Sequence, residues 1–194
     1  MHLTSLPSPF GVGTMGQAAR DFADFLQQAG QSLWQLLPIC PTGFGDSPYQ
    51  SFSAFAGNPY LIDLEDLTRD GLLERADYCH INWGERPQTV DYGRLYQQRG
   101  GVLRKACRRV LKREAFHAFC QQNAFWLDDY ALFMALKEEQ GNAPWFDWPL
   151  PLRDRQPLAL EQAGAGVVAV GTLSRVCPFE RMVEKEIARV ARGD

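Results

Sequence analysis

The fold class follows from residues 32–39, which read Ser32-Leu33-Trp34-Gln35-Leu36-Leu37-Pro38-Ile39. A short apolar run that ends near a proline predicts a buried strand. The preceding residues 18–29 carry Phe22 and Phe25 at helical spacing, and Gly30 can end that helix. Because a loop, a helix and a buried strand follow one another, we predict an α/β fold with parallel strands.

A long polar and aromatic loop follows the predicted strand. It reads Pro41-Thr42-Gly43-Phe44-Gly45-Asp46-Ser47-Pro48-Tyr49-Gln50-Ser51-Phe52-Ser53-Ala54-Phe55-Ala56-Gly57-Asn58-Pro59-Tyr60. Loops of this length inside compact domains are usually functional or disordered, and five aromatic residues argue against disorder. Aromatic rings can cover the apolar faces of a pyranose while short polar side chains bond its hydroxyls. The loop therefore predicts a sugar-binding surface, with Trp145 and Trp148 as another candidate platform. The alternative is that the loop aromatics close the mouth of a hydrophobic core.

Length and charge restrict the class of protein. The chain has 194 residues, with 20 Lys and Arg against 23 Asp and Glu and a net charge of −3. This length predicts one domain or slightly more, and the charge balance gives no basic field for nucleic acid. No apolar stretch reaches the roughly 18 residues of a membrane helix, and residues 1–7 do not resemble a signal peptide. We therefore predict no nucleic-acid partner and no membrane partner.

The five cysteines are odd in number and irregularly spaced. This pattern predicts reduced thiols in a cytoplasmic protein rather than a disulfide framework. A zinc site could be assembled from Cys79, His80, Cys107, His117 and Cys120, but no C-x-x-C pair supports it. We therefore predict structural thiols and no metal.

Other segments show helical periodicity. We predict a short helix and turn over residues 65–75, helices over residues 96–113, 116–139 and 179–192, and a short strand over residues 61–64. The spacing Gly164-x-Gly166-x-x-Ala169 superficially fits a dinucleotide fingerprint. That fingerprint requires a strand before the glycines, whereas the strand-like residues here lie within and after them.

Chemistry at a glycosidic bond requires two carboxylates that flank the bond. The candidates are Asp46, Asp63, Glu65, Asp66, Asp128 and Asp129. Asp128 and Asp129 are neighbours on a predicted helix, so their side chains point about 100° apart and do not converge. No pair among the candidates is compelling from the sequence.

Several motifs together carry a family resemblance. They are His2–Gly13, Trp34–Pro38, Pro41–Pro59, Val90–Tyr92, Trp126–Lys137 and Trp148–Arg153. These motifs resemble the amylomaltases, the bacterial 4-α-glucanotransferases of glycoside hydrolase family 77, and the similarity covers about residues 2–163. The motif in residues 41–59 is the most specific of them.

The resemblance implies a fold and an activity. The fold would be a TIM-type (β/α)₈ barrel with helical insertions, of which this chain would contain an incomplete N-terminal portion. The activity would be transfer of α-1,4-glucan segments to a glucan or glucose acceptor, by a retaining double displacement through a covalent glycosyl-enzyme and without a cofactor. Maltooligosaccharides or α-1,4-glucans would be the substrates, in the cytoplasm.

The resemblance also implies roles for individual residues. Active sites of such barrels lie at the carboxyl ends of the strands, where residues 41–60 would be placed. Tyr49 matches a tyrosine that stacks on the sugar beside the cleaved bond, and Asp46 and Ser47 would contact its hydroxyls. Phe44 and Tyr96 match two aromatic positions of a second, surface glucan site.

The match also has limits. A TIM barrel typically needs about 250 residues, with about 200 as a lower bound, and the chain has 194. The family's nucleophile, acid/base and transition-state carboxylates all lie beyond the matched residues, so we assign no catalytic residue and expect the isolated chain to be inactive. Residues 164–194 are expected to be a divergent tail that follows the family portion 1–163. The alternatives are a non-catalytic maltooligosaccharide-binding fragment and a chain without function that aggregates.

Overall fold

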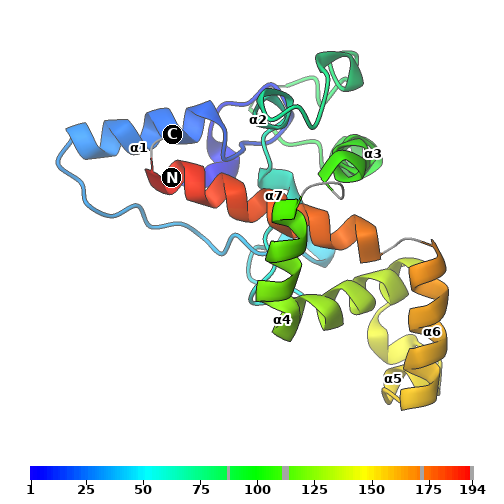
Figure 1. The fold of residues 1–194 in the computed structure, drawn as a ribbon. Helices are drawn as coiled ribbons and strands as arrows, with labels where there is room; N and C mark the ends of the chain where they lie inside the picture. Colours follow the sequence, from blue (N-terminus) through cyan, green and yellow to red (C-terminus); the bar gives the residue numbers. More distant parts are fainter. Residues whose placement is uncertain (87, 111–113, 171–172, 193–194) are drawn as a thin grey trace. The chain divides into compact units, whose positions relative to one another are not determined.

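The computed structural model describes residues 1–86, 88–110, 114–170 and 173–192, without the side chains of Phe44, residues 164–170, residues 173–181 and Glu186. The chain divides into two compact units, shown as ribbons in Figure 1. Unit 1 comprises Met1–Lys112 together with Phe179–Asp194, and unit 2 comprises Arg113–Pro178.

Unit 1 is built from short helices joined by long loops. Its elements are η1 (Leu3–Ser5), α1 (Gln17–Gln28), η2 (Phe44–Asp46), η3 (Pro59–Leu61), α2 (Leu64–Arg69), η4 (Arg75–Asp77), α3 (Tyr92–Val110) and the part of α7 (Leu173–Arg192) that begins at Phe179, where η denotes a 3₁₀ helix. The second half of α7, red in Figure 1, lies alongside α1, and residues of both helices line one apolar groove. The predicted helix over residues 18–29 is confirmed as α1, and the short helix predicted within residues 65–75 is α2. The helix predicted over residues 96–113 is confirmed as far as Val110, because residues 111–113 lie outside the described residues.

A buried ion pair joins α1 to α2. Asp63 caps α2, because its Oδ1 accepts the backbone N–H groups of Glu65 (2.9 Å) and Asp66 (3.1 Å). Asp66 is fully buried, and its Oδ2 accepts a hydrogen bond of 2.8 Å from Nη1 of Arg20 on α1. The two helices are therefore held together by a charge pair in a desolvated environment.

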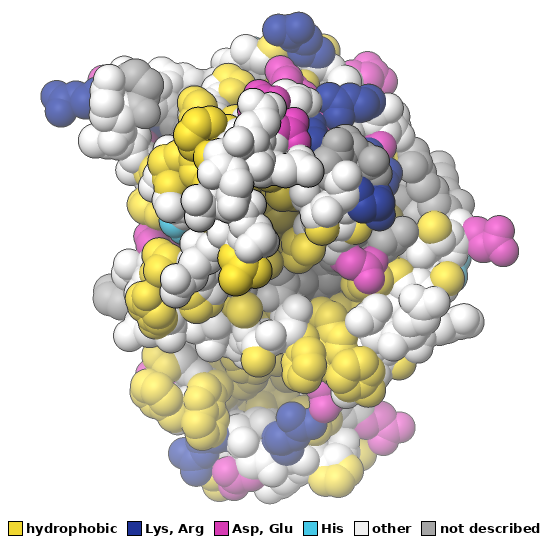
Figure 2. Space-filling view, turned by 90° about the vertical axis from the view of Figure 1, so that its left-hand side faces the viewer, with side chains coloured by type: hydrophobic (Ala, Val, Ile, Leu, Met, Phe, Trp, Pro, Cys, Tyr) yellow, Lys and Arg dark blue, Asp and Glu magenta, His cyan; other side chains and the backbone are white. Residues whose placement is uncertain are grey.

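The predicted strand at residues 32–39 is wrong for this structure. The described part of the chain contains no strand, and Leu33 is 88% exposed. A strand is stable only when a neighbour satisfies its backbone groups, and residues 32–38 have none among the described residues. Figure 2 shows hydrophobic side chains, in yellow, at the surface. Phe25, Leu33 and Phe55 are among the large apolar side chains of unit 1 that are exposed.

The predicted strand at residues 61–64 is also wrong. Leu61 ends η3 and Leu64 begins α2, because Asn58 and Asp63 cap these helices with their side chains. The described residues therefore form a helical structure, and the α/β class and the barrel remain predictions.

The described secondary structure of unit 2 consists of helices joined by turns and short loops. It contains α4 (Glu114–Glu139), η5 (Trp145–Asp147), α5 (Leu150–Arg153), α6 (Pro157–Val170) and the first residues of α7. α4 packs against α6, and α5 packs against both η5 and α6. The predicted helix over residues 116–139 is confirmed, and the segment from Gly164 to Ala169 lies within α6 rather than beside a strand.

Among the described helices, none has the length and the apolar character that crossing a lipid bilayer requires.

Candidate functional site

The loop of residues 41–60 folds back on itself. The Gly43 N–H donates to the Gln50 carbonyl at 2.9 Å, which closes the turn around η2. Gly45 and Asp46 are both left-handed, with φ of 81° and 55°. This conformation is open to glycine and tolerated by aspartate. The two residues give the backbone a sharp bend that places the Asp46 side chain at the wall of a cavity.

A tyrosine from α3 holds the Asp46 carboxylate. The Tyr96 hydroxyl donates a hydrogen bond to Asp46 Oδ1, and the Tyr60 ring meets the Tyr96 ring edge to face at 5.8 Å. Burial, the hydrogen bond to Asp46 and the charge of that carboxylate together raise the pKa of Tyr96 to about 12. Tyr96 is therefore a protonated donor at neutral pH.

The cavity beside Asp46 has a volume of about 110 Å³ and is lined by both polar and apolar side chains. Its lining includes His2, Thr42, Asn58, Tyr60 and Tyr92. The His2 Nδ1 is buried and has no hydrogen-bond partner among the described residues. Burial, followed by the charge of the N-terminal amine, lowers the pKa of His2. A buried nitrogen that lacks a protein partner can bond a polar ligand or water.

Arg99 of α3 anchors the end of the loop. Its Nη2 donates to the carbonyls of Tyr60 (3.2 Å) and Ile62, and its guanidinium lies 5.6 Å from the ring centroid of Trp83 and 6.0 Å from that of Phe10. Burial lowers the pKa of Arg99 to about 10, so the group stays charged at neutral pH. The cavity wall formed by residues 58–62 is therefore tied to a rigid helix.

The serines of the loop bond its own backbone. Ser47 Oγ accepts the Tyr49 N–H at 3.3 Å, and Ser53 Oγ accepts the N–H groups of Phe55 and Ala56 at 3.1 and 3.0 Å. Tyr49 is 73% exposed and Phe55 is 64% exposed. These two aromatic rings therefore face solvent and do not close a hydrophobic core.

The structure brings part of the predicted site together. Asp46 and Tyr96 touch, although the sequence prediction assigned them to two separate glucan contacts. Ser47 follows Asp46 directly, and Tyr49 lies exposed two residues further on. The backbone of Phe44 begins η2, and its side chain lies outside the described residues.

Sequence reasoning did not single out His2, Thr42 and Tyr92 as parts of this cavity. Tyr92 could have been found, because residues four apart on a helix share a face and Tyr96 was already a candidate. Thr42 lies four residues before Asp46 in the same loop motif, whereas no local signal in the sequence links His2 to Asp46.

The other candidate carboxylates of the described residues do not line the cavity beside Asp46. Asp63 Oδ2 accepts the Thr14 hydroxyl at 2.6 Å while its Oδ1 caps α2, and Asp66 is buried against Arg20. Asp128 and Asp129 are exposed on α4 of unit 2. In the part of the chain that the structure describes, no group of three or more His, Cys, Asp or Glu side chains is arranged to hold a metal ion.

Comparison with known proteins identifies relatives of the chain. The family model described as 4-alpha-glucanotransferase matches residues 1–169. A 4-alpha-glucanotransferase of Thermus thermophilus is 53% identical in an alignment of 169 positions, and the match covers 84% of this chain and 33% of the relative. One of Clostridium butyricum is 44% identical over 164 residues, which are 84% of this chain and 34% of the relative.

A solved structure is similar to the whole chain. It is the amylomaltase from Streptococcus agalactiae in complex with acarbose, with 38% identity and a TM-score of 0.93, over 100% of this chain and 39% of that one. The chain spans about a third of the length of the curated relatives it matches.

Proposed function

The chain belongs to the 4-alpha-glucanotransferase family, and on that premise we propose that residues 41–60 form a glucan-binding surface of an enzyme that transfers α-1,4-glucan segments. The acceptor is another glucan or glucose, and the reaction is a retaining double displacement. The observation that carries the proposal is the hydrogen bond from Tyr96 to Asp46, whose carboxylate lies at the wall of a cavity with mixed polar and apolar lining.

The exposed ring of Tyr49 supports a stacking role. An aromatic face open to solvent can cover the apolar face of a glucose unit. Asp46 and Ser47 lie two or three residues away and bond sugar hydroxyls in this proposal. A carboxylate that accepts one hydrogen bond from Tyr96 keeps further acceptor capacity for such hydroxyls.

Phe44 and Tyr96 provide the second glucan contact in this proposal. Tyr96 is 54% exposed, so its ring can contact a sugar while its hydroxyl bonds Asp46. The two contacts then share one carboxylate, and a glucan that displaces the Tyr96 hydrogen bond also changes the position of Asp46. This coupling follows from the geometry of η2 and α3.

Residues 1–163 contribute binding and no catalytic residue in this proposal. A retaining mechanism needs two carboxyl groups about 5–5.5 Å apart on either side of the bond. Asp63 and Asp66 are committed to a helix cap and to Arg20, so neither is available as a nucleophile or an acid. The isolated chain would therefore bind glucan without catalysing its transfer. The proposal places the protein in the cytoplasm. The (β/α)₈ barrel belongs to the same proposal.

The proposal is tested with the purified chain. We expect no glucose release from maltotriose above the blank, and maltoheptaose at millimolar concentration should shift the backbone amide NMR signals of Gly43 and Gly45. Tyr49→Ala should abolish the shifts, whereas Tyr49→Phe, which keeps the ring, should retain them. Glucose release would contradict the absence of catalytic residues, and unchanged binding by Tyr49→Ala would contradict the stacking role.

A further inference from the structure

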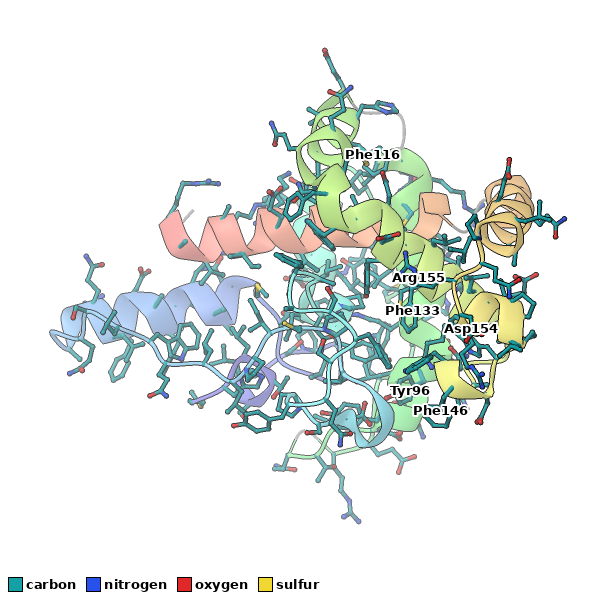
Figure 3. All side chains as sticks on the ribbon, turned by 90° about the horizontal axis from the view of Figure 1, so that it is seen from below. Tyr96, Phe116, Phe133, Phe146, Asp154 and Arg155 are labelled. Atoms are coloured by element: carbon teal, nitrogen blue, oxygen red, sulfur yellow. The ribbon has the colours of Figure 1, made fainter. Side chains whose placement is uncertain are left out.

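Unit 2 contains a cavity of its own, of about 300 Å³. Its walls are mostly apolar and include Phe133 of α4, Trp145 of η5 and Trp148 beside four leucines, and the charged residues Asp129, Arg153 and Arg155 also line it. Figure 3 shows Phe133, Phe146, Asp154 and Arg155 gathered on one side of this unit. A volume of this size lies at the lower end of the range for small-molecule sites.

The aromatic wall of the cavity is held in place by specific contacts. Trp148 is 7% exposed, stacks on Phe133 with ring centroids 5.5 Å apart, and donates its Nε1–H to the Ala143 carbonyl at 3.1 Å. Lys137 Nζ donates to the same carbonyl at 3.2 Å and so supports the turn that carries η5. Trp145 is 55% exposed and offers a ring to solvent at the cavity.

The mouth of the cavity is charged. Arg155 Nη2 lies 3.2 Å from Asp129 Oδ1, and both side chains are about two-thirds exposed. Arg153 Nε lies 3.4 Å from Asp154 Oδ1. A guanidinium and a carboxylate side by side offer both donors and acceptors, which is what a ring of sugar hydroxyls requires.

The backbone at Arg155 gives a second, independent observation. Arg155 has a φ of 54° and occupies the position after the α5 C-cap, where the Gln156 N–H donates to the Pro151 carbonyl at 2.9 Å. Glycine is the usual residue at this position of the motif, because a Cβ is unfavourable in the left-handed region. An arginine that occupies a strained position at the mouth of a cavity points to a role for its side chain.

We propose that this cavity is an accessory binding site for an α-1,4-glucan, in which Trp145 stacks on a glucose unit while Arg155 and Asp129 bond its hydroxyls. The ligand class rests on the proposed function, and the site is separate in sequence from residues 41–60. An apolar protein segment fits less well, because covering the charged pairs at the mouth would desolvate them. A sugar satisfies these charges with its hydroxyls.

The test uses the full chain and the indole N–H NMR signal of Trp145, assigned with Trp145→Phe. We expect millimolar maltoheptaose to shift this signal, in the wild type and equally in Tyr49→Ala. The β-1,4-linked cellohexaose should leave it unchanged. Trp145→Ala should weaken binding at this cavity by about two- to tenfold, read from the Arg155 side-chain signal.

Arg155→Gly is the sharpest variant, because glycine relieves the strain at this position and the chain should fold at least as well. It should lose the maltoheptaose shift of Trp145, while Leu158→Ala, at an exposed residue of α6 away from the cavity, should keep it. A Trp145 signal that never responds, while the Gly43 and Gly45 signals do, would overturn the accessory site and leave the proposed function intact. A Trp145 response without any response in residues 41–60 would support the accessory site and contradict the proposed function. An equal response to cellohexaose would overturn the assignment to α-1,4-glucans.

Discussion

Replacing Asp66 by asparagine should strongly destabilise unit 1. Asp66 is fully buried and its two oxygens lie 2.8 and 3.2 Å from the guanidinium of Arg20, which is itself only 4% exposed. Asp66 also accepts a hydrogen bond from Arg69 at 2.5 Å and lies 3.8 Å from Nη1 of Arg189. Asparagine has nearly the same volume, so no cavity forms. The cost comes from removing the counter-charge of these arginines, above all of the buried Arg20. Breaking a buried pair in this way costs about 3–5 kcal/mol. For a chain of this size that corresponds to a fall in melting temperature of about 6–20 °C.

The assay should report unit 1 separately, because the two units need not unfold together. Hydrogen exchange of the buried amides in α1 and α2 provides this, alongside thermal unfolding followed by circular dichroism. The matched control is Glu85→Gln, which removes an exposed ion pair at 3.0 Å from Arg94 and should cost less than about 1 kcal/mol. If Asp66→Asn costs no more than this control, the assignment of a desolvated pair between α1 and α2 is refuted.

Three further predictions concern single residues. Tyr96→Phe should change the stability of the chain at high pH. The pKa of Tyr96 in the folded chain is raised from 10.0 to about 12, so the stability that protonated Tyr96 contributes is present below pH 10 and is lost as the pH rises toward 12. In urea unfolding between pH 9 and 12, the free energy of unfolding should therefore fall less in the variant than in the wild type. An equal fall in both proteins would contradict the raised pKa. Burial raises the pKa of Cys107 to about 12, whereas Cys79 is exposed. The reaction of the thiols with Ellman's reagent at neutral pH should therefore lose a fast phase in Cys79→Ser and keep every fast phase in Cys107→Ser. In Gly57→Ala the new methyl would lie 2.1 Å from Val183 of α7; we expect a destabilisation of about 1–3 kcal/mol in urea unfolding, and wild-type stability would show that α7 does not pack there.

The sequence predicted the helices well where their periodicity is local. Residues 18–29 and 116–139 became α1 and α4 with shifts of one or two residues, because a helix closes its hydrogen bonds between residues four apart. The strand prediction at residues 32–39 failed for the complementary reason. Its apolar pattern is real, but a strand bonds to another strand, and the described residues contain none for it to pair with.

In the candidate site, too, the features set by neighbouring residues were predictable and those set by distant residues were not. The motif in residues 41–59 indicated the family and the loop, and the family resemblance made Asp46, Ser47, Tyr49 and Tyr96 candidates. Their grouping was not predictable, because Asp46 and Tyr96 are 50 positions apart and meet only when α3 packs beside the loop. The carboxylates Asp63 and Asp66 looked like candidates for chemistry, and burial gave them structural roles.

The sequence by itself therefore determined the family, the helical segments and the loop that carries the aromatic and hydroxyl groups, since each depends on neighbouring residues or on a contiguous motif. The tertiary structure alone decided which carboxylates pair with arginines, that Tyr96 bonds Asp46, and that Trp145 and Arg155 share a cavity with Phe133. These features depend on contacts between residues far apart in the chain. Their energies come from burial and charge pairing, which a linear pattern does not contain.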